Sequence, residues 1–147
     1  MEATLFTIGF TKKNAEQFFS LLRKVEIRRV LDIRLNNVSQ LAAFAKRDDL
    51  RYFLKELCGA EYLHLPEFAP TEAILADYKK KGGSWERYEE QFLPLIRARE
   101  IEDRLPLAML DRACLLCSEP TPEKCHRRLA ADYLAQYHHP CLIIRHL

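Results

Sequence analysis

The residues of this sequence that are best suited to chemistry follow an apolar run near its C-terminal end. Cys117 and Glu119 end the run that begins at Ala113, and Cys125 and His126 follow a few residues later. A thiol becomes a nucleophile when it is held as a thiolate, and a carboxylate can transfer protons. The spacing therefore predicts a thiol site in which Cys117 or Cys125 is the nucleophile and Glu119 is the acid or base.

Two earlier apolar runs also end in pairs of residues that suit a site: Thr7 with Gly9, and Asp32 with Arg34. Residues two apart on a strand face the same side, and the carboxyl ends of parallel strands meet at one edge of a sheet. We therefore expect both pairs to lie beside Cys117. Asp32 of the second pair is expected to take part in catalysis, and the residues expected to bind an anion are Thr7, Gly9 and Arg34.

The segment that follows these residues carries the signals of a helix start. Thr121 and Pro122 suit an N-cap and a first helical position, which predicts a helix over residues 122–137. The N-terminus of a helix offers free N–H groups and a positive dipole end to an anion. We expect His126 and Arg127, in the first turns, to complete the anion site.

Each of these residues also has a purely structural interpretation, which the sequence leaves open. Free cysteine is often buried, so Cys125 could simply pack the helix on the sheet. Asp32 and Arg34 could form an ion pair that holds a loop. Glu119 could bond the backbone N–H groups at the helix start.

The residue types of a zinc site are present, but their spacing argues against one. On a strand, Cys114 and Cys117 point to opposite faces because their positions differ by an odd number. Cys125 and His126 are adjacent, about 100° apart on a helix, and would not easily share an ion. We therefore expect no metal. The phosphatase loop, the glycine-rich phosphate loop and the Gly-x-Ser-x-Gly elbow are absent, and the sequence points to no particular cofactor.

The elements that must position these residues alternate between strands and helices. Strands are predicted over residues 4–9, 29–34, 61–65, 113–119 and 141–145, and helices over residues 14–24, 50–58, 71–80, 85–99 and 122–137. Such alternation favours a single α/β domain over residues 1–147, with three α/β/α layers and a mainly parallel sheet of about five strands.

The composition places the chain among ordinary globular proteins, with 48% hydrophobic and 30% charged residues. The apolar runs are too short for a membrane span, and the first residues do not resemble a signal peptide. With five cysteines, an odd number, these features predict a cytoplasmic protein with reduced thiols and no membrane partner.

The motifs, taken in order, resemble the family of domains of unknown function numbered 488. Its pattern is Thr-x-Gly, Asp-Val-Arg, Cys-x-Glu and Cys-His-Arg, and the matching segments here are Thr7-Ile8-Gly9, Asp32-Ile33-Arg34, Cys117-Ser118-Glu119 and Cys125-His126-Arg127. Residues 37–44 and 62–66 also look like stretches of that family. The family often has histidine directly after Thr-x-Gly, where this chain has Phe10. The resemblance implies a three-layer α/β fold and supports the site, but it implies no particular activity.

These observations favour an enzyme that acts on an anionic small molecule or nucleotide. The alternative is a non-catalytic module that binds a phosphate, a nucleotide or nucleic acid, for which the basic runs at residues 28–29, 79–81 and 127–128 could hold phosphates. The net charge of +2 is too small to argue for nucleic acid. The oligomeric state is left open.

Overall fold

The centre of the fold is a sheet of five parallel strands in the order β3-β2-β4-β1-β5. The strands are β1 (Ala3–Gly9), β2 (Arg29–Asp32), β3 (Glu61–His64), β4 (Ala113–Cys117) and β5 (Leu142–His146). This computed structural model describes residues 1–38 and 42–147. Residues 39–41, which belong to the family-like stretch 37–44, lie outside the described residues.

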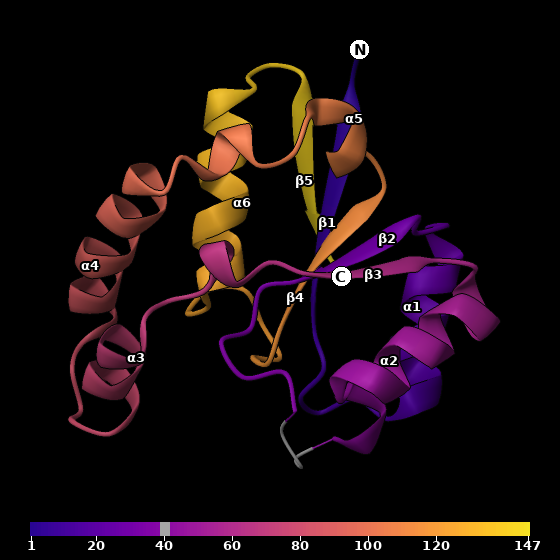
Figure 1. Cartoon of the computed structure of the whole chain (residues 1–147), viewed down its shortest axis with the longest axis horizontal. Coiled ribbons are helices and arrows are strands. Elements are labelled where there is room, and N and C mark those ends of the chain that lie inside the picture. Colours follow the sequence, from indigo (N-terminus) through magenta and orange to yellow (C-terminus); the bar gives the residue numbers. More distant parts are fainter. Residues whose placement is uncertain (39–41) are drawn as a thin grey trace.

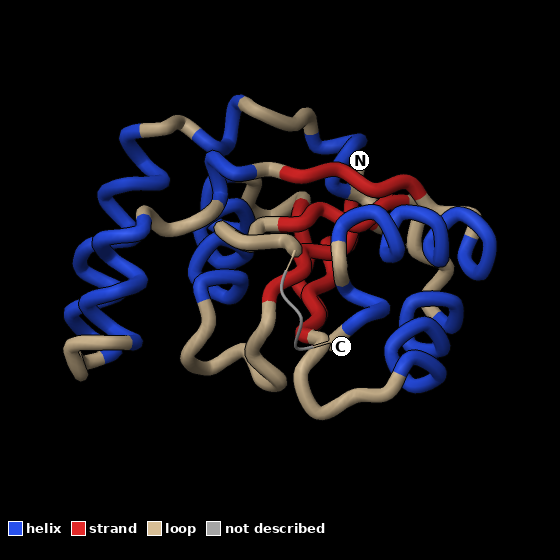
Figure 2. The backbone as a smooth tube through the Cα atoms, turned by 60° about the horizontal axis from the view of Figure 1, so that its bottom comes forward, coloured by secondary structure: helices blue, strands red, loops and turns tan. Residues whose placement is uncertain are grey.

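Helices cover both faces of the sheet, as Figures 1 and 2 show. They are α1 (Ala15–Lys24), α2 (Arg47–Phe53), α3 (Glu72–Lys79), α4 (Trp85–Ala98), α5 (Leu107–Leu110) and α6 (His126–Tyr137). The short 3-10 helices are η1 (Ala43–Ala45), η3 (Pro66–Phe68) and η4 (Ile101–Asp103), and η2 (Leu54–Cys58) is a π-helix that follows α2. The predicted α/β fold with a parallel sheet is confirmed. Within the described residues, the helices are too short or too polar to span a lipid bilayer.

The two faces of the sheet bury two separate hydrophobic cores because side chains alternate along each strand. On β4, Cys114 and Leu116 belong to the core beneath α1 and α2, whereas Leu115 belongs to the core beneath α4 and α6. Cys117 therefore faces the same side as Leu115, toward α6. This alternation decides which polar side chains at the strand ends can meet.

Helix starts follow the local sequence in most places but not at α6. Asn14 caps α1 in a capping box with Gln17, as its type and position predict. The prediction that a helix starts at Pro122 is wrong, because α6 begins at His126 with Cys125 as its N-cap. Residues 118–125 form turns and bends instead. They carry the chain away from β4 and back to the edge of the sheet.

The loop after β4 presses on the end of β1 at Gly9. A Cβ atom at Gly9 would lie 1.6 Å from the carbonyl oxygen of Glu119 and 2.8 Å from Nη1 of Arg127. No side chain fits in this space, so glycine is required for the backbone of β1 to approach the loop. Gly9 therefore allows the Glu119 carbonyl and the Arg127 side chain to lie directly against the end of β1.

This close approach predicts a large effect of one added methyl group. Gly9→Ala forces the loop after β4 to move, and we expect the free energy of unfolding to fall by about 3 kcal/mol in urea denaturation. Gly82→Ala is the matched control: the space around Gly82 is open and its φ is +68°, so only backbone strain of about 1 kcal/mol applies. Equal losses in the two variants would contradict the steric argument.

Candidate functional site

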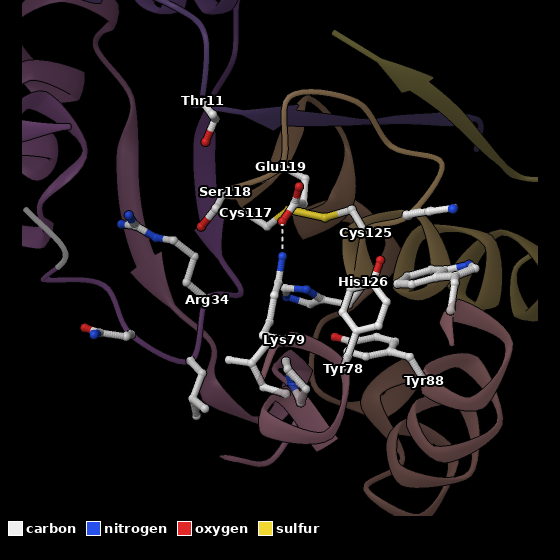
Figure 3. Close-up of a pocket in the computed structure, with 16 residues that line it drawn as sticks. Thr11, Arg34, Tyr78, Lys79, Tyr88, Cys117, Ser118, Glu119, Cys125 and His126 are labelled. Carbon is white, nitrogen blue, oxygen red and sulfur yellow. Dashed lines mark hydrogen bonds and ion pairs between the residues drawn. A yellow bond between two sulfur atoms is a disulfide. The ribbon is translucent and has the colours of Figure 1, made fainter. Parts of the chain in front are cut away.

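A cavity of about 400 Å³ lies at the carboxyl edge of the sheet, between the ends of β2 and β4 and the helices α3 and α4 (Figure 3). Ligands of parallel α/β sheets usually bind at this edge. The cavity combines sulfur, charged groups and aromatic rings; it is lined by Thr11, Arg34, Leu35, Asn36, Pro70, Leu75, Tyr78, Lys79, Trp85, Tyr88, Cys117, Ser118, Glu119, Lys124, Cys125 and His126.

Cys117 and Cys125 meet at this cavity and are joined by a disulfide, with their Cα atoms 7.6 Å apart. Cys117 ends β4, and Cys125 precedes α6 in an extended conformation. The expectation of reduced thiols therefore holds only for the other three cysteines, Cys58, Cys114 and Cys141. The two cysteines predicted as candidate nucleophiles are brought together in one place.

Arg127 lies fully buried beneath the sulfur pair. Its Nη1 donates to the Sγ atom of Cys117 at 3.5 Å and to the carbonyl oxygen of Glu119, and its Nε donates to Oγ1 of Thr7 at 3.2 Å. Nη2 is buried without a partner, and no ion pair among the described residues includes Arg127. Burial lowers the pKa of this guanidinium, which reflects its unfavourable desolvation.

Part of the predicted anion site lies outside the lining of the cavity. Thr7, Gly9 and Arg127 do not line the cavity. Thr7 is fully buried and bonds Nδ1 of His146 at 2.6 Å as well as Arg127. These three residues lie where β1, the loop after β4 and α6 contact one another. An anion bound in the cavity would not contact them directly, because they do not line it.

His126 lines the cavity as a neutral imidazole. Its Nε2 lies 2.7 Å from the carbonyl oxygen of Ile33, and because a carbonyl only accepts, Nε2 must carry the hydrogen. Burial lowers the pKa of His126 to about 4. His126 therefore adds no positive charge for an anion, and its Nδ1 keeps an unprotonated lone pair.

Cys117, Cys125 and His126 form one cluster of potential metal ligands. One ligand atom from each lies within 4.8 Å of the other two. The argument that adjacent residues on a helix cannot share an ion fails here, because Cys125 is an extended N-cap and only His126 is helical. Cys114 is buried in the core on the opposite face, as its strand parity predicts.

Asp32 and Arg34 form a buried ion pair that leaves Asp32 outside the cavity. The Arg34 side chain donates to both carboxylate oxygens, and the Tyr62 hydroxyl donates to Oδ2. Asp32 aligns with Leu116 of β4, so it faces the α2 side rather than the sulfur pair. This geometry favours the structural interpretation of the pair, and a catalytic role of Asp32 stays a prediction.

Phe10 occupies the position where the family often has histidine. Its ring lies 5.4 Å from the guanidinium carbon of Arg34, a cation–π contact. Phe10 is buried in the core beneath α1 and α2. At this position the chain packs an aromatic ring against the buried ion pair.

Glu119 and two lysines provide the accessible charges of the cavity. Nζ of Lys79, at the end of α3, lies 2.6 Å from Oε1 of Glu119, as drawn in Figure 3. Lys124 lines the cavity next to Cys125. Of the three basic runs, residues 28–29 start β2 at the opposite end of that strand from the site, so the runs do not form one surface.

An aromatic wall is the feature that the sequence analysis missed. Tyr78, Trp85 and Tyr88 line the cavity from α3 and α4, and the Trp85 and Tyr88 rings stack with centroids 4.8 Å apart. The sequence analysis predicts only helices over residues 71–80 and 85–99 here and assigns no role to these aromatic residues. The concentration of three aromatic residues around the glycine pair was the available signal.

The position of Asp32 predicts that it supports the fold rather than the chemistry. Asp32→Asn leaves the Arg34 charge buried without a counter-charge, so we expect the free energy of unfolding to fall by about 3 kcal/mol. After reduction of the disulfide, the alkylation rate of Cys117 should be the same as in wild type. Asp48→Asn, in an exposed ion pair with Arg47, is the control and should cost less than about 1 kcal/mol. A stable Asp32→Asn protein with altered Cys117 reactivity would refute this assignment.

Comparison with known proteins supports the resemblance seen in the motifs. Residues 14–134 match the family described as Domain of unknown function DUF488. This range includes the Asp32, Cys117 and Cys125 motifs and begins after Gly9. No curated protein and no solved structure matches the chain. Because the match extends over most of the sequence, the chain belongs to the DUF488 family of domains of unknown function.

Proposed function

We propose that this protein is an enzyme that acts on a small anionic molecule in the cavity, with Cys117 as the nucleophile. The observation that carries the proposal is the contact between Sγ of Cys117 and the buried guanidinium of Arg127. A buried charge is strongly unfavourable without a counter-charge. When the disulfide is reduced, a thiolate at Cys117 supplies that counter-charge, and a thiolate stabilised by arginine is an activated nucleophile.

Cys125 and Glu119 have supporting roles in this proposal. Cys125 can bond to Cys117, so it serves as the second thiol, and the active form is the reduced one. Glu119 borders the cavity within reach of solvent and is the candidate acid or base, with Lys79 holding its carboxylate in place. Arg127 stabilises the nucleophile instead of binding the substrate.

The lining of the cavity supports a substrate that is anionic at one end and flat or apolar at the other. Lys124 is the lining cation that has no ion pair within the described residues, since Asp32 already neutralises Arg34 and Glu119 pairs with Lys79. The wall of Tyr78, Trp85 and Tyr88 suits an apolar ring. A nucleotide combines both properties. The nucleic-acid alternative has less support, because Arg127 is buried and residues 28–29 lie away from the cavity.

The thiolate proposal predicts fast alkylation of Cys117 that depends on Arg127. In a reduced Cys125→Ser background, which prevents the disulfide, iodoacetamide should modify Cys117 faster than Cys58, whose pKa is raised by burial. Arg127→Met should slow the reaction at least about tenfold, equivalent to one pKa unit. The measurement is peptide mass spectrometry after timed labelling.

Arg128→Met is the matched control, because Arg128 is the next residue on α6 and pairs with Asp132 near the surface. In the Arg128→Met variant, Cys117 should be alkylated at the same rate as in the Cys125→Ser parent protein. Circular dichroism checks that each variant is folded, and Arg127→Gln replaces Arg127→Met if the latter does not fold. An unchanged Cys117 rate in a folded Arg127 variant would remove the basis of the proposal.

The substrate class predicts a preference for a charged nucleotide over its neutral nucleoside. Adenosine 5′-monophosphate, used as the probe, should raise the melting temperature of the reduced protein more than adenosine does. Lys124→Met should weaken this binding by about tenfold, the loss of one charge-assisted hydrogen bond. Lys24→Met, on α1 away from the cavity, should have no effect. Equal binding of the two probes would contradict the anionic substrate class.

A further inference from the structure

We propose that the reduced protein binds one zinc ion through Cys117, Cys125 and His126, with the fourth coordination position open to the cavity. This inference goes beyond the proposed function and does not depend on it. It rests on the convergence of three ligand atoms within 4.8 Å of one another. Two thiolates and one imidazole are a ligand set that zinc uses in catalytic sites, where water or substrate takes the fourth position.

The orientation of His126 supports metal binding independently of that distance. Metal-binding histidines usually donate their other ring N–H to a carbonyl or carboxylate, which fixes the ring and its tautomer. Here the Ile33 carbonyl accepts from Nε2 at 2.7 Å, which leaves Nδ1 as the free donor atom. Ile33 is itself fixed, because its N–H donates to the Leu116 carbonyl oxygen at 3.1 Å. The orientation of the His126 ring is thus fixed by a hydrogen bond to the backbone at the end of β2.

The spacing of the two cysteines leaves room for an ion. Their Cα atoms are 7.6 Å apart, wider than the roughly 4.4–6.8 Å usual for disulfides. Thiolates that share a tetrahedral zinc ion at about 2.3 Å lie farther apart than bonded sulfurs. Reduction of the bond therefore frees two ligands in positions that an ion between them can bridge.

The groups around the cluster favour an open site over a closed one. All three ligands line the cavity, and the described residues supply no fourth ligand to the cluster. The nearby Glu119 carboxylate is engaged by Lys79 at 2.6 Å. Arg127 donates an N–H to the Cys117 sulfur, a contact that orients a metal-bound thiolate from beneath. The free position therefore faces the space where a small molecule would bind.

Zinc and the disulfide compete for the same two sulfurs. Oxidation by hydrogen peroxide takes one electron from each thiolate to form the S–S bond, and with two protons it yields two waters and releases Zn²⁺. A zinc-bound thiolate stays deprotonated and can remain nucleophilic. Zinc would thus keep Cys117 in the reduced form that the proposed function also requires.

The test is the metal content of the full chain, purified with a phosphine reductant and without chelators. We expect inductively coupled plasma mass spectrometry to find one zinc ion per chain. In metal-free protein, cobalt should give a sulfur-to-cobalt charge-transfer band and the intense visible bands of tetrahedral coordination. Cys117→Ser, Cys125→Ser and His126→Gln should each weaken zinc binding by more than about 100-fold. Peroxide should release the metal from wild type.

Cys58→Ser and Cys141→Ser are the matched controls, since both residues are free cysteines outside the cluster, and they should keep the zinc. Circular dichroism distinguishes loss of the site from loss of the fold. The proposal is overturned if reduced wild type binds neither zinc nor cobalt, or if the folded cluster variants bind zinc as wild type does. Neither result depends on a substrate, so a failure here is distinguishable from a failure of the proposed enzyme activity.

Discussion

The structure of the site depends on one buried guanidinium, that of Arg127. It is held by a side chain of β1, a carbonyl of the loop after β4 and the sulfur that ends β4. β1 is far from β4 and the loop after it in the sequence, and Arg127 of α6 contacts all three. Gly9 makes the arrangement sterically feasible, because any side chain there would occupy the place of the Glu119 carbonyl and of Arg127. The buried positive charge of Arg127 needs a compensating negative charge. The packing that buries Arg127 against Cys117 therefore also determines how readily the Cys117 thiol ionises.

The two buried arginines of the site differ in their counter-charges. Arg34 has its own carboxylate, Asp32, which accepts from it at both oxygens. Arg127 has hydrogen-bond acceptors but no carboxylate partner in the described part of the chain. A compensated buried pair is inert and serves the fold, whereas an uncompensated charge stabilises any negative charge that forms next to it. Cys117, whose sulfur accepts a hydrogen bond from Arg127, is a neighbour that can acquire such a charge.

Of the residues that the sequence analysis predicts for the site, some line one cavity and others are buried away from it. Alternating strands and helices predicted a parallel sheet whose strand ends share an edge, and Cys117, Glu119 and Cys125 do lie there. The side on which Asp32 faces depends on its alignment with Leu116, and sequence periodicity within one strand cannot supply the register between strands. Thr121-Pro122 is a valid local signal for a helix start, whereas α6 begins at His126, where Arg127 contacts the Glu119 carbonyl and Thr7 of β1. Contacts between distant segments, such as Phe10 on Arg34, leave no local signal at all.

The same charge argument bears on the redox state of the cysteine pair. In the disulfide form neither sulfur carries charge, so the guanidinium of Arg127 faces a neutral acceptor in a buried position. In the reduced form a thiolate at Cys117 neutralises it. Whatever stabilises the thiolate stabilises the reduced state relative to the disulfide, and a pair with a stabilised reduced form is reduced more readily. Arg127 therefore biases the pair toward free sulfurs, and those are the atoms that can attack a substrate or hold a metal ion.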